Sequence, residues 1–100
     1  MKNILLVCSA GMSTSLLVTK MEAAAKAKGV ECHIEALAEA DAHKKLNEVD
    51  VLLLGPQVRF LLSKFKKEAP ANLPIEVIDT VAYGTMNGAK VLDRALELIG

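Results

Sequence analysis

The chain has 100 residues, of which 52% are hydrophobic and only 3% aromatic. This length suits a single domain spanning residues 1–100, and the composition requires an aliphatic core, as in helices packed on a sheet. Twelve basic and twelve acidic residues cancel. Because no Lys/Arg stripe is interleaved with aromatic residues, nucleic acid is excluded as a partner.

The first half of the chain predicts a strand, a helix and a second strand. The apolar run from Asn3 to Val7 is typical of a central strand that helices cover on both faces. From Ser13 the spacing of apolar residues predicts a helix, which Gly29 is placed to end. Between Val30 and Ala36, apolar and polar residues alternate, which indicates a half-exposed strand near a sheet edge.

The second half predicts two more strands and three helices. A weak helix over residues 39–46 precedes the apolar strand Val51–Leu54, and Pro56 then opens another helix. The buried face of that helix is expected to comprise Val58, Leu61, Leu62 and Phe65. A fourth strand is expected at Ile75–Ile78, followed by a loop from Asp79 to Thr85. The last helix is expected to bury Val91, Leu92, Ala95 and Ile99.

Strands that alternate with helices in this way predict an α/β fold. We expect a three-layer sandwich, with an open four-stranded parallel sheet and helices on both faces. Ligands bind such sheets outside the carboxyl ends of the strands. Cys8, residues 55–57 and residues 79–83 all fall at predicted carboxyl ends, so three separate segments can line one site.

The residues that follow the first strand suit an anion site with a reactive thiol. Small residues such as Ser9, Ala10 and Gly11 allow successive backbone N–H groups to converge next to a helix start. The same groups favour the thiolate form of Cys8, which is the nucleophile, and would stabilise a phosphoryl group on its sulfur. The alternative is that Cys8 is a small buried residue that ends a strand, but packing does not explain the loop.

Three ordered segments carry a resemblance that spans essentially the whole chain. They are Cys8–Ser15, Leu53–Val58 and Glu76–Gly84. Together they resemble the enzyme IIB component of the bacterial lactose, cellobiose and chitobiose phosphotransferase system, which uses phosphoenolpyruvate to phosphorylate sugars. The resemblance implies a cytoplasmic phosphotransferase component that docks transiently on the inner face of the membrane and does not insert into it.

What the resemblance implies for the chemistry is a phosphocysteine at Cys8. The family's cysteine takes phosphate from a phosphohistidine on the IIA component and passes it to a disaccharide bound by the membrane component IIC. The family's phosphate loop follows that cysteine without a gap. It maps onto Ser9, Ala10, Gly11, Met12, Ser13, Thr14 and Ser15, with backbone amides as the expected donors, although Ser and Thr there are equally expected as helix caps.

The family is also similar in fold and cysteine placement to low-molecular-weight protein tyrosine phosphatases. Their signature has an arginine six residues after the cysteine, where this chain has Thr14. That arginine stabilises transition-state charge during hydrolysis, and a carrier gains by omitting it. The alternative function is therefore a low-molecular-weight phosphatase or an arsenate-reductase-like enzyme that uses the Cys8 thiolate.

Several other residues have two interpretations each. Asp79 occupies the position of a phosphatase general acid and could orient Tyr83 or a partner's histidine, but a carboxylate at a strand end is more often a turn or cap residue. Gln57 and Tyr83 are further supporting candidates at the same edge. Met12 is either an adaptable partner contact or a core residue. The third helix carries Lys64, Lys66 and Lys67. These lysines form either a docking patch for an acidic partner or a solvated helix face.

No metal or cofactor is expected. Adjacent strand residues point to opposite faces, so Cys32, facing inward, and His33, facing outward, cannot bind one ion together. Cys8 and Cys32 are expected to remain free thiols, because cytosolic proteins keep thiols reduced. The P-loop pattern of nucleotide-binding proteins is absent from the sequence, so ATP is not the expected phosphate source, and other molecules must supply both donor and acceptor. The apolar run near the start is far shorter than the ~20 residues that cross a bilayer.

Overall fold

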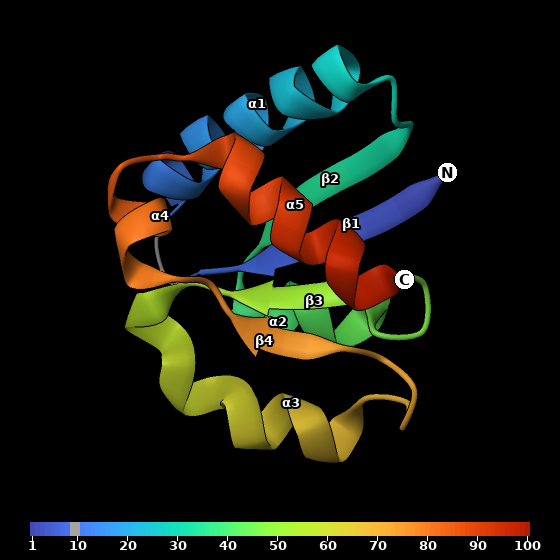
Figure 1. Cartoon of the computed structure of the whole chain (residues 1–100). Coiled ribbons are helices and arrows are strands. Elements are labelled where there is room, and N and C mark those ends of the chain that lie inside the picture. The colour runs from blue at the N-terminus through green and yellow to red at the C-terminus, as the bar shows by residue number, and fades with distance from the viewer. Residues whose placement is uncertain (9–10) are drawn as a thin grey trace.

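The computed structural model describes residues 1–8 and 11–100, and for residues 11–14 it describes the backbone alone. Four parallel strands form one sheet in the order β2-β1-β3-β4. The strands are β1 (Lys2–Val7), β2 (Cys32–Leu37), β3 (Val51–Leu54) and β4 (Ile75–Val77). This arrangement confirms the predicted α/β fold, with β1 as a central strand and β2 at an edge (Figure 1).

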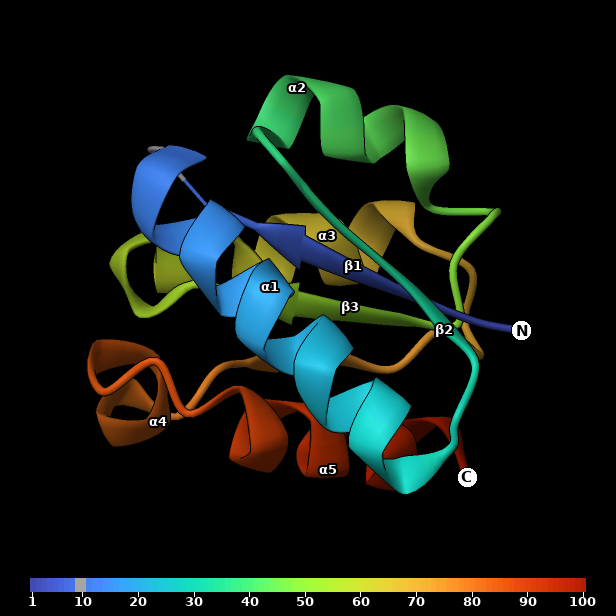
Figure 2. The ribbon, with the colours of Figure 1, turned by 90° about the horizontal axis from the view of Figure 1, so that it is seen from above.

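Helices cover both faces of the sheet, so the molecule has three layers (Figure 2). One face carries α1 (Gly11–Lys28) and α5 (Gly88–Ile99). The other carries α2 (Glu39–Ala42) with the 3₁₀ turn η1 (His43–Lys45), and α3 (Leu62–Glu68), which continues from the 3₁₀ segment η2 (Pro56–Leu61). A short helix, α4 (Thr80–Gly84), follows β4 at the carboxyl edge of the sheet (Figure 1).

The central strand explains why its sequence is a continuous apolar run. Side chains alternate between faces along a strand. Ile4 and Leu6 pack in the core beneath α1 and α5, whereas Leu5 and Val7 pack in the core beneath α2 and α3. All four are at most 1% exposed, so β1 is held from both sides and the position of the residue that follows it is well defined.

The predicted elements differ from the structure mainly at their ends. Helix α1 begins at Gly11 rather than Ser13, and it ends before Gly29, whose φ of +71° is the left-handed conformation that favours glycine. The weak helix predicted over residues 39–46 is divided between α2 and η1. Strand β2 spans Cys32–Leu37 rather than residues 30–36, and β4 ends one residue early, at Val77.

The two helical segments that begin at Pro56 and Gly88 bury the predicted faces, with small departures. The segment that Pro56 opens is first a 3₁₀ turn and becomes an α-helix only at Leu62. Its buried face is as predicted, although Leu62 itself is half-buried. In α5 the predicted core residues are likewise buried, with Ile99 only half-buried at the end of the helix.

The predicted loop from Asp79 to Thr85 is wrong, because these residues contain helix α4. Its first turn is stabilised by Asp79, whose carboxylate accepts a hydrogen bond from the backbone N–H of Ala82 at 2.9 Å. The carbonyl of Asp79 also accepts from the N–H of Tyr83, at 2.9 Å. A side-chain cap of this kind satisfies N–H groups that the first turn of a helix leaves free.

Candidate functional site

The ends of three strands meet at one edge of the sheet. Val7 at the end of β1 lies opposite Leu54 at the end of β3, which lies opposite Val77 at the end of β4. Adjacent strands are about 4.8 Å apart. The residues that follow these strand ends therefore stand side by side, and the first of them is Cys8.

Backbone hydrogen bonds continue the ladder just past the ends of the strands. The N–H of Cys8 donates to the carbonyl of Leu37 at 3.3 Å, and the N–H of Gly55 donates to the carbonyl of Val7 at 2.9 Å. One strand further along, the N–H of Ile78 donates to the carbonyl of Leu54 at 2.8 Å. The three predicted site segments are thus aligned at this edge by the sheet itself.

Cys8 lies between the buried end of β1 and the start of the longest helix. The residue is only 5% exposed, and α1 begins three residues later, at Gly11. A chain of three residues spans at most about 11 Å, so the amino end of α1 is close to the thiol. The first N–H groups of a helix lack partners within it, and they give its amino end a partial positive charge that favours anions.

The predicted phosphate loop falls largely outside what the structure describes. Ser9 and Ala10 lie outside the described residues, as do the side chains of Met12, Ser13 and Thr14. The described backbone places residues 11–15 in the first turns of α1 rather than in a loop. Ser15 is exposed on that helix, and its carbonyl accepts a hydrogen bond from the Thr19 hydroxyl at 3.1 Å.

Gln57 and Tyr83 are brought together across the edge. The side-chain amide of Gln57, on η2, donates to the Tyr83 hydroxyl, on α4, at 2.9 Å. Gly55 leaves the room for this contact, because a Cβ there would lie 2.7 Å from Oε1 of Gln57 and 3.4 Å from the carbonyl oxygen of Val7. The amide of Gln57 therefore folds back over the end of β3, beside β1, which Cys8 follows.

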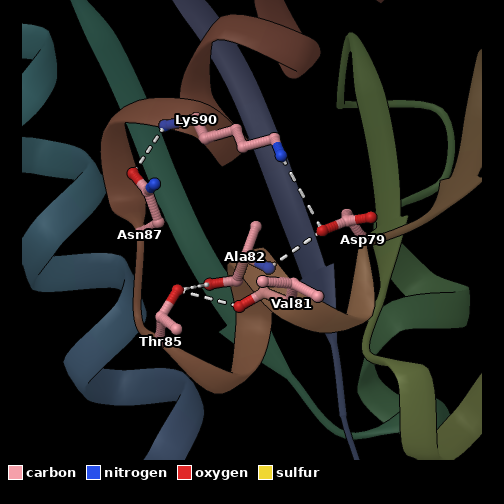
Figure 3. A network of polar contacts seen from close by, with 6 residues as sticks. All are labelled: Asp79, Val81, Ala82, Thr85, Asn87 and Lys90. Atoms are coloured by element: carbon pink, nitrogen blue, oxygen red, sulfur yellow. Dashed lines mark hydrogen bonds and ion pairs between the residues drawn. The ribbon is translucent and has the colours of Figure 1, made fainter.

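Asp79 lies at the head of a polar network that fixes α4 (Figure 3). Its Oδ2 accepts from the N–H of Ala82 and lies 4.0 Å from Nζ of Lys90. The backbone N–H of Lys90 donates to Asn87 Oδ1 at 3.1 Å, which caps α5. The carboxylate of Asp79 is thus engaged in capping, and this geometry favours the structural interpretation of Asp79 over an acid–base role.

The lysines of the third helix have different surroundings. Lys64 forms an ion pair with Glu39 of α2 at 2.6 Å, and its hydrogen bond holds the pKa of the Glu39 carboxyl below the ordinary value. His43 stacks on the ring of Phe65 with 4.8 Å between centroids, and its Nδ1 lies 2.9 Å from Glu68. Lys64 therefore helps to tie α2 to α3, whereas Lys66 and Lys67 are exposed.

The second cysteine lies in a different environment from the first. Cys32 is half-buried against the core beneath α1 and α5, and burial raises the pKa of its thiol. His33 is exposed on the opposite face of the strand, as the alternation predicted. Among the described residues, no three metal-ligating side chains gather, and no described helix is long and apolar enough to cross a membrane.

The sequence interpretation missed three exposed apolar side chains on the segments that follow β1, β3 and β4. They are Leu16 on α1, Phe60 on η2 and Val81 on α4. Phe60 offered a signal, because it falls between the buried positions Val58 and Leu61 rather than on the helical spacing that they share. Val81 gave none, because its segment was predicted to be a loop.

Comparisons with known proteins agree on one family. The family model described as "PTS system, Lactose/Cellobiose specific IIB subunit" matches residues 3–94. The oligo-β-mannoside-specific EIIB component of Bacillus subtilis (strain 168) is 48% identical over 100 residues, which cover 99% of this chain and 97% of that protein. The galactose-specific EIIB component of Lactococcus lactis subsp. cremoris (strain MG1363) is 46% identical over 104 residues, which cover 98% of this chain and 96% of that protein.

A solved structure extends the agreement to the fold. The solution structure of the cellobiose-specific phosphotransferase IIB component from Borrelia burgdorferi superposes with a TM-score of 0.81. The two chains are 47% identical, and the match covers 98% of this chain and 91% of that one.

Proposed function

Because the chain belongs to the lactose/cellobiose-specific IIB family of the sugar phosphotransferase system, we propose that Cys8 carries a phosphoryl group between two partners. The donor is a phosphohistidine on a IIA component, and the acceptor is a sugar bound by a membrane IIC component. The observation that carries the proposal is the place of Cys8, which is buried at the carboxyl end of a central strand and followed within three residues by helix α1.

The first step transfers the group from nitrogen to sulfur. The Cys8 thiolate attacks the phosphorus, the S–P bond forms and the P–N bond breaks. The nitrogen of the donor imidazole keeps the electron pair of that bond and takes up one proton, which balances the proton that the Cys8 thiol loses, so the ring returns to its neutral form. The amino end of α1 favours the thiolate before the step and the phosphoryl oxygens after it, because its partial positive charge faces an anion in both states.

The second step transfers the group from sulfur to oxygen. A hydroxyl oxygen of the sugar attacks the phosphorus, the O–P bond forms and the S–P bond breaks. Cys8 leaves as the thiolate, and the hydroxyl proton passes to a base on the acceptor side. A thiolate is a good leaving group, so the protein is returned to its starting state, ready for another donor.

The segment after Cys8 is proposed to hold the phosphoryl group through backbone N–H groups of Ser9–Ser15. A cradle of this kind binds three phosphoryl oxygens without an arginine. The absence of an arginine at Thr14 suits a carrier, since water would otherwise compete for the phosphate. The hydrogen bond between Gln57 and Tyr83 is proposed to keep η2 and α4 in place beside this cradle.

The proposal extends to the setting in which the chain works. We place it in the cytoplasm, with residues 1–100 as one self-contained domain that docks on the inner face of the membrane at IIC. The sugar is a disaccharide of the cellobiose, chitobiose or lactose class. The relatives are described as specific for oligo-β-mannoside and galactose, so sugars differ among similar IIB chains, as expected if IIC makes the choice.

Paired cysteine variants test the mechanism. We expect Cys8→Ser to abolish phosphoenolpyruvate-dependent sugar phosphorylation in an assay that supplies the general enzymes, IIA and IIC-containing membranes. An alkoxide is far harder to form at neutral pH than a thiolate. Cys32→Ser is the matched control and should keep full activity, because Cys32 lies on β2 against the core. An active Cys8→Ser protein, with its fold intact by circular dichroism, would refute the mechanism.

A further inference from the structure

Three exposed apolar side chains lie on segments that follow the ends of β1, β3 and β4. Apart from Met1, the large hydrophobic residues that are exposed in the described part of the chain are Leu16 at 48%, Phe60 at 74% and Val81 at 69%. Their segments, α1, η2 and α4, follow β1, β3 and β4 respectively. Because the strands are parallel, η2, α4 and the amino end of α1 lie at the same end of the sheet, opposite the N-terminus (Figure 1).

The same segments are almost free of charge. Residues 11–19, 56–61 and 80–87 contain one charged residue, Arg59, although 24% of the whole chain is charged. By contrast, residues 39–45, which follow the edge strand β2, contain Glu39, Asp41, Lys44 and Lys45. Depletion of charge around exposed apolar and aromatic groups is the compositional sign of the centre of a protein interface.

The one charged residue is suited to an anionic partner. Arg59 is adjacent to Phe60 on η2, is exposed, and forms no ion pair with any residue that the structure describes. Asp79, the nearest carboxylate in sequence to α4, is occupied by the N–H of Ala82 and by Lys90. The edge therefore presents apolar side chains and a cation, a combination that complements an anion set in an apolar face.

We propose that Leu16, Phe60 and Val81, called here the apolar rim, seat the phosphohistidine-bearing donor protein, with Arg59 attracting its negative charge during approach. This inference rests on the proposed function and deepens it. Cys8 is only 5% exposed, so a donor imidazole must approach closely to reach the sulfur. Apolar contacts between the rim and the donor protein would exclude water from the transfer.

The test measures how transfer to Cys8 depends on donor concentration. The variant Phe60→Ser/Val81→Ser changes two side chains that are largely exposed, and Ala40→Ser on α2 is a control at an exposed position away from the rim. Phosphorylated IIA is mixed with each protein, and phosphocysteine is followed by rapid quench. We expect the half-saturating IIA concentration to rise about tenfold or more in the double variant, with no change in Ala40→Ser.

Two further measurements test whether the substitutions in the rim have changed the reactivity of the Cys8 thiol or the stability of the fold. The rate of Cys8 alkylation by iodoacetamide and the urea midpoint should equal those of the parent protein in both variants. Arg59→Gln should slow transfer at low salt and reduce its dependence on ionic strength, because steering by a cation is screened by salt.

The outcomes distinguish the two proposals. If the parent protein is never phosphorylated at Cys8 by phosphorylated IIA, the proposed function fails whatever the rim does. If the parent is phosphorylated and the double variant shows the same dependence on IIA, the rim inference is overturned while the function stands. The inference that the rim binds the donor is also overturned if the double variant accepts phosphate from IIA normally and is impaired only in transfer to IIC. The same holds if the double variant differs from the parent protein only in self-association, measured by sedimentation.

Discussion

Replacing Gly88 with alanine tests the close approach of α5 to α1, on which the position of the Cys8 edge depends. A Cβ at Gly88 would lie 2.5 Å from the carbonyl carbon of Lys20 and 2.6 Å from the backbone nitrogen of Met21. Ordinary carbon contacts are about 3.5–4.0 Å, so the overlap is on the order of 1 Å. The atoms belong to the backbone of α1, and a rotamer change cannot relieve the overlap.

The expected loss follows from two opposing effects. Overpacking of this kind costs about 1–3 kcal/mol, and the better helix propensity of alanine recovers at most about 1 kcal/mol. We therefore expect Gly88→Ala to lower the free energy of unfolding by about 1–2 kcal/mol. For a domain of this size that corresponds to a decrease in Tm of roughly 5–15 °C.

Urea unfolding followed by circular dichroism measures this loss directly. The matched control is Gly84→Ala at the end of α4, where a Cβ would meet no atom within 4 Å. That variant should be neutral or slightly stabilising, because it only restricts the unfolded chain. Equal midpoints for Gly88→Ala and Gly84→Ala would show that the two helices do not approach as closely as described.

Three further predictions concern α4, the core and a surface ion pair. Asp79→Ala should lower the free energy of unfolding by about 1 kcal/mol, because it removes the N-cap of α4. Asp79→Asn should retain most of that stability, since asparagine can also cap a helix. Equal decreases in the urea midpoint for the two variants would contradict the capping role. Phe65→Ala should lower the free energy of unfolding by about 3–5 kcal/mol, because the ring is fully buried. Phe60→Ala should leave it nearly unchanged, because that ring is exposed. Similar urea midpoints for the two variants would refute the assignment of Phe65 to the buried face and Phe60 to the exposed one. The two hydrogen bonds from Arg94 hold the pKa of Glu76 below its ordinary value of 4.5. Glu76 therefore contributes about 0.5–1 kcal/mol to the free energy of unfolding after solvent screening. The full contribution is present above the pKa that Glu76 has in the unfolded chain. It is lost as the pH falls through the lower pKa that Glu76 has in the folded protein. Acid unfolding curves that are unchanged in Glu76→Gln would contradict this linkage.

Elements with a long apolar pattern could be predicted from the sequence. The runs that became β1 and β3 are buried on both faces, so their apolar character is continuous, and α5 shows its core face at helical spacing. Because the strands are parallel, the rule for carboxyl ends also placed Cys8, Gln57 and Tyr83 at one edge. The contact between Gln57 and Tyr83 itself joins residues 26 positions apart, and no local pattern could indicate it.

The parts that were not predicted depend on short segments and on tertiary contacts. Helix α4 has five residues, including a β-branched pair and a terminal glycine, so it lacks the two turns over which a helical period is recognisable. Its cap, Asp79, was compatible with either a turn or a helix start. Phe60 is different, because the helical spacing of Val58 and Leu61 already leaves it off the buried face, so its exposure could have been predicted.

The most direct test of the central claim is mass spectrometry of the protein after incubation with phosphoenolpyruvate, the general phosphotransferase enzymes and a cognate IIA. We predict one phosphoryl group per chain, located by peptide analysis on Cys8, which disappears when IIC-containing membranes and sugar are added. An unmodified Cys8 in the presence of fully phosphorylated IIA would contradict the account, and hydrolysis of an aryl phosphate that depends on Cys8 would then favour the phosphatase alternative.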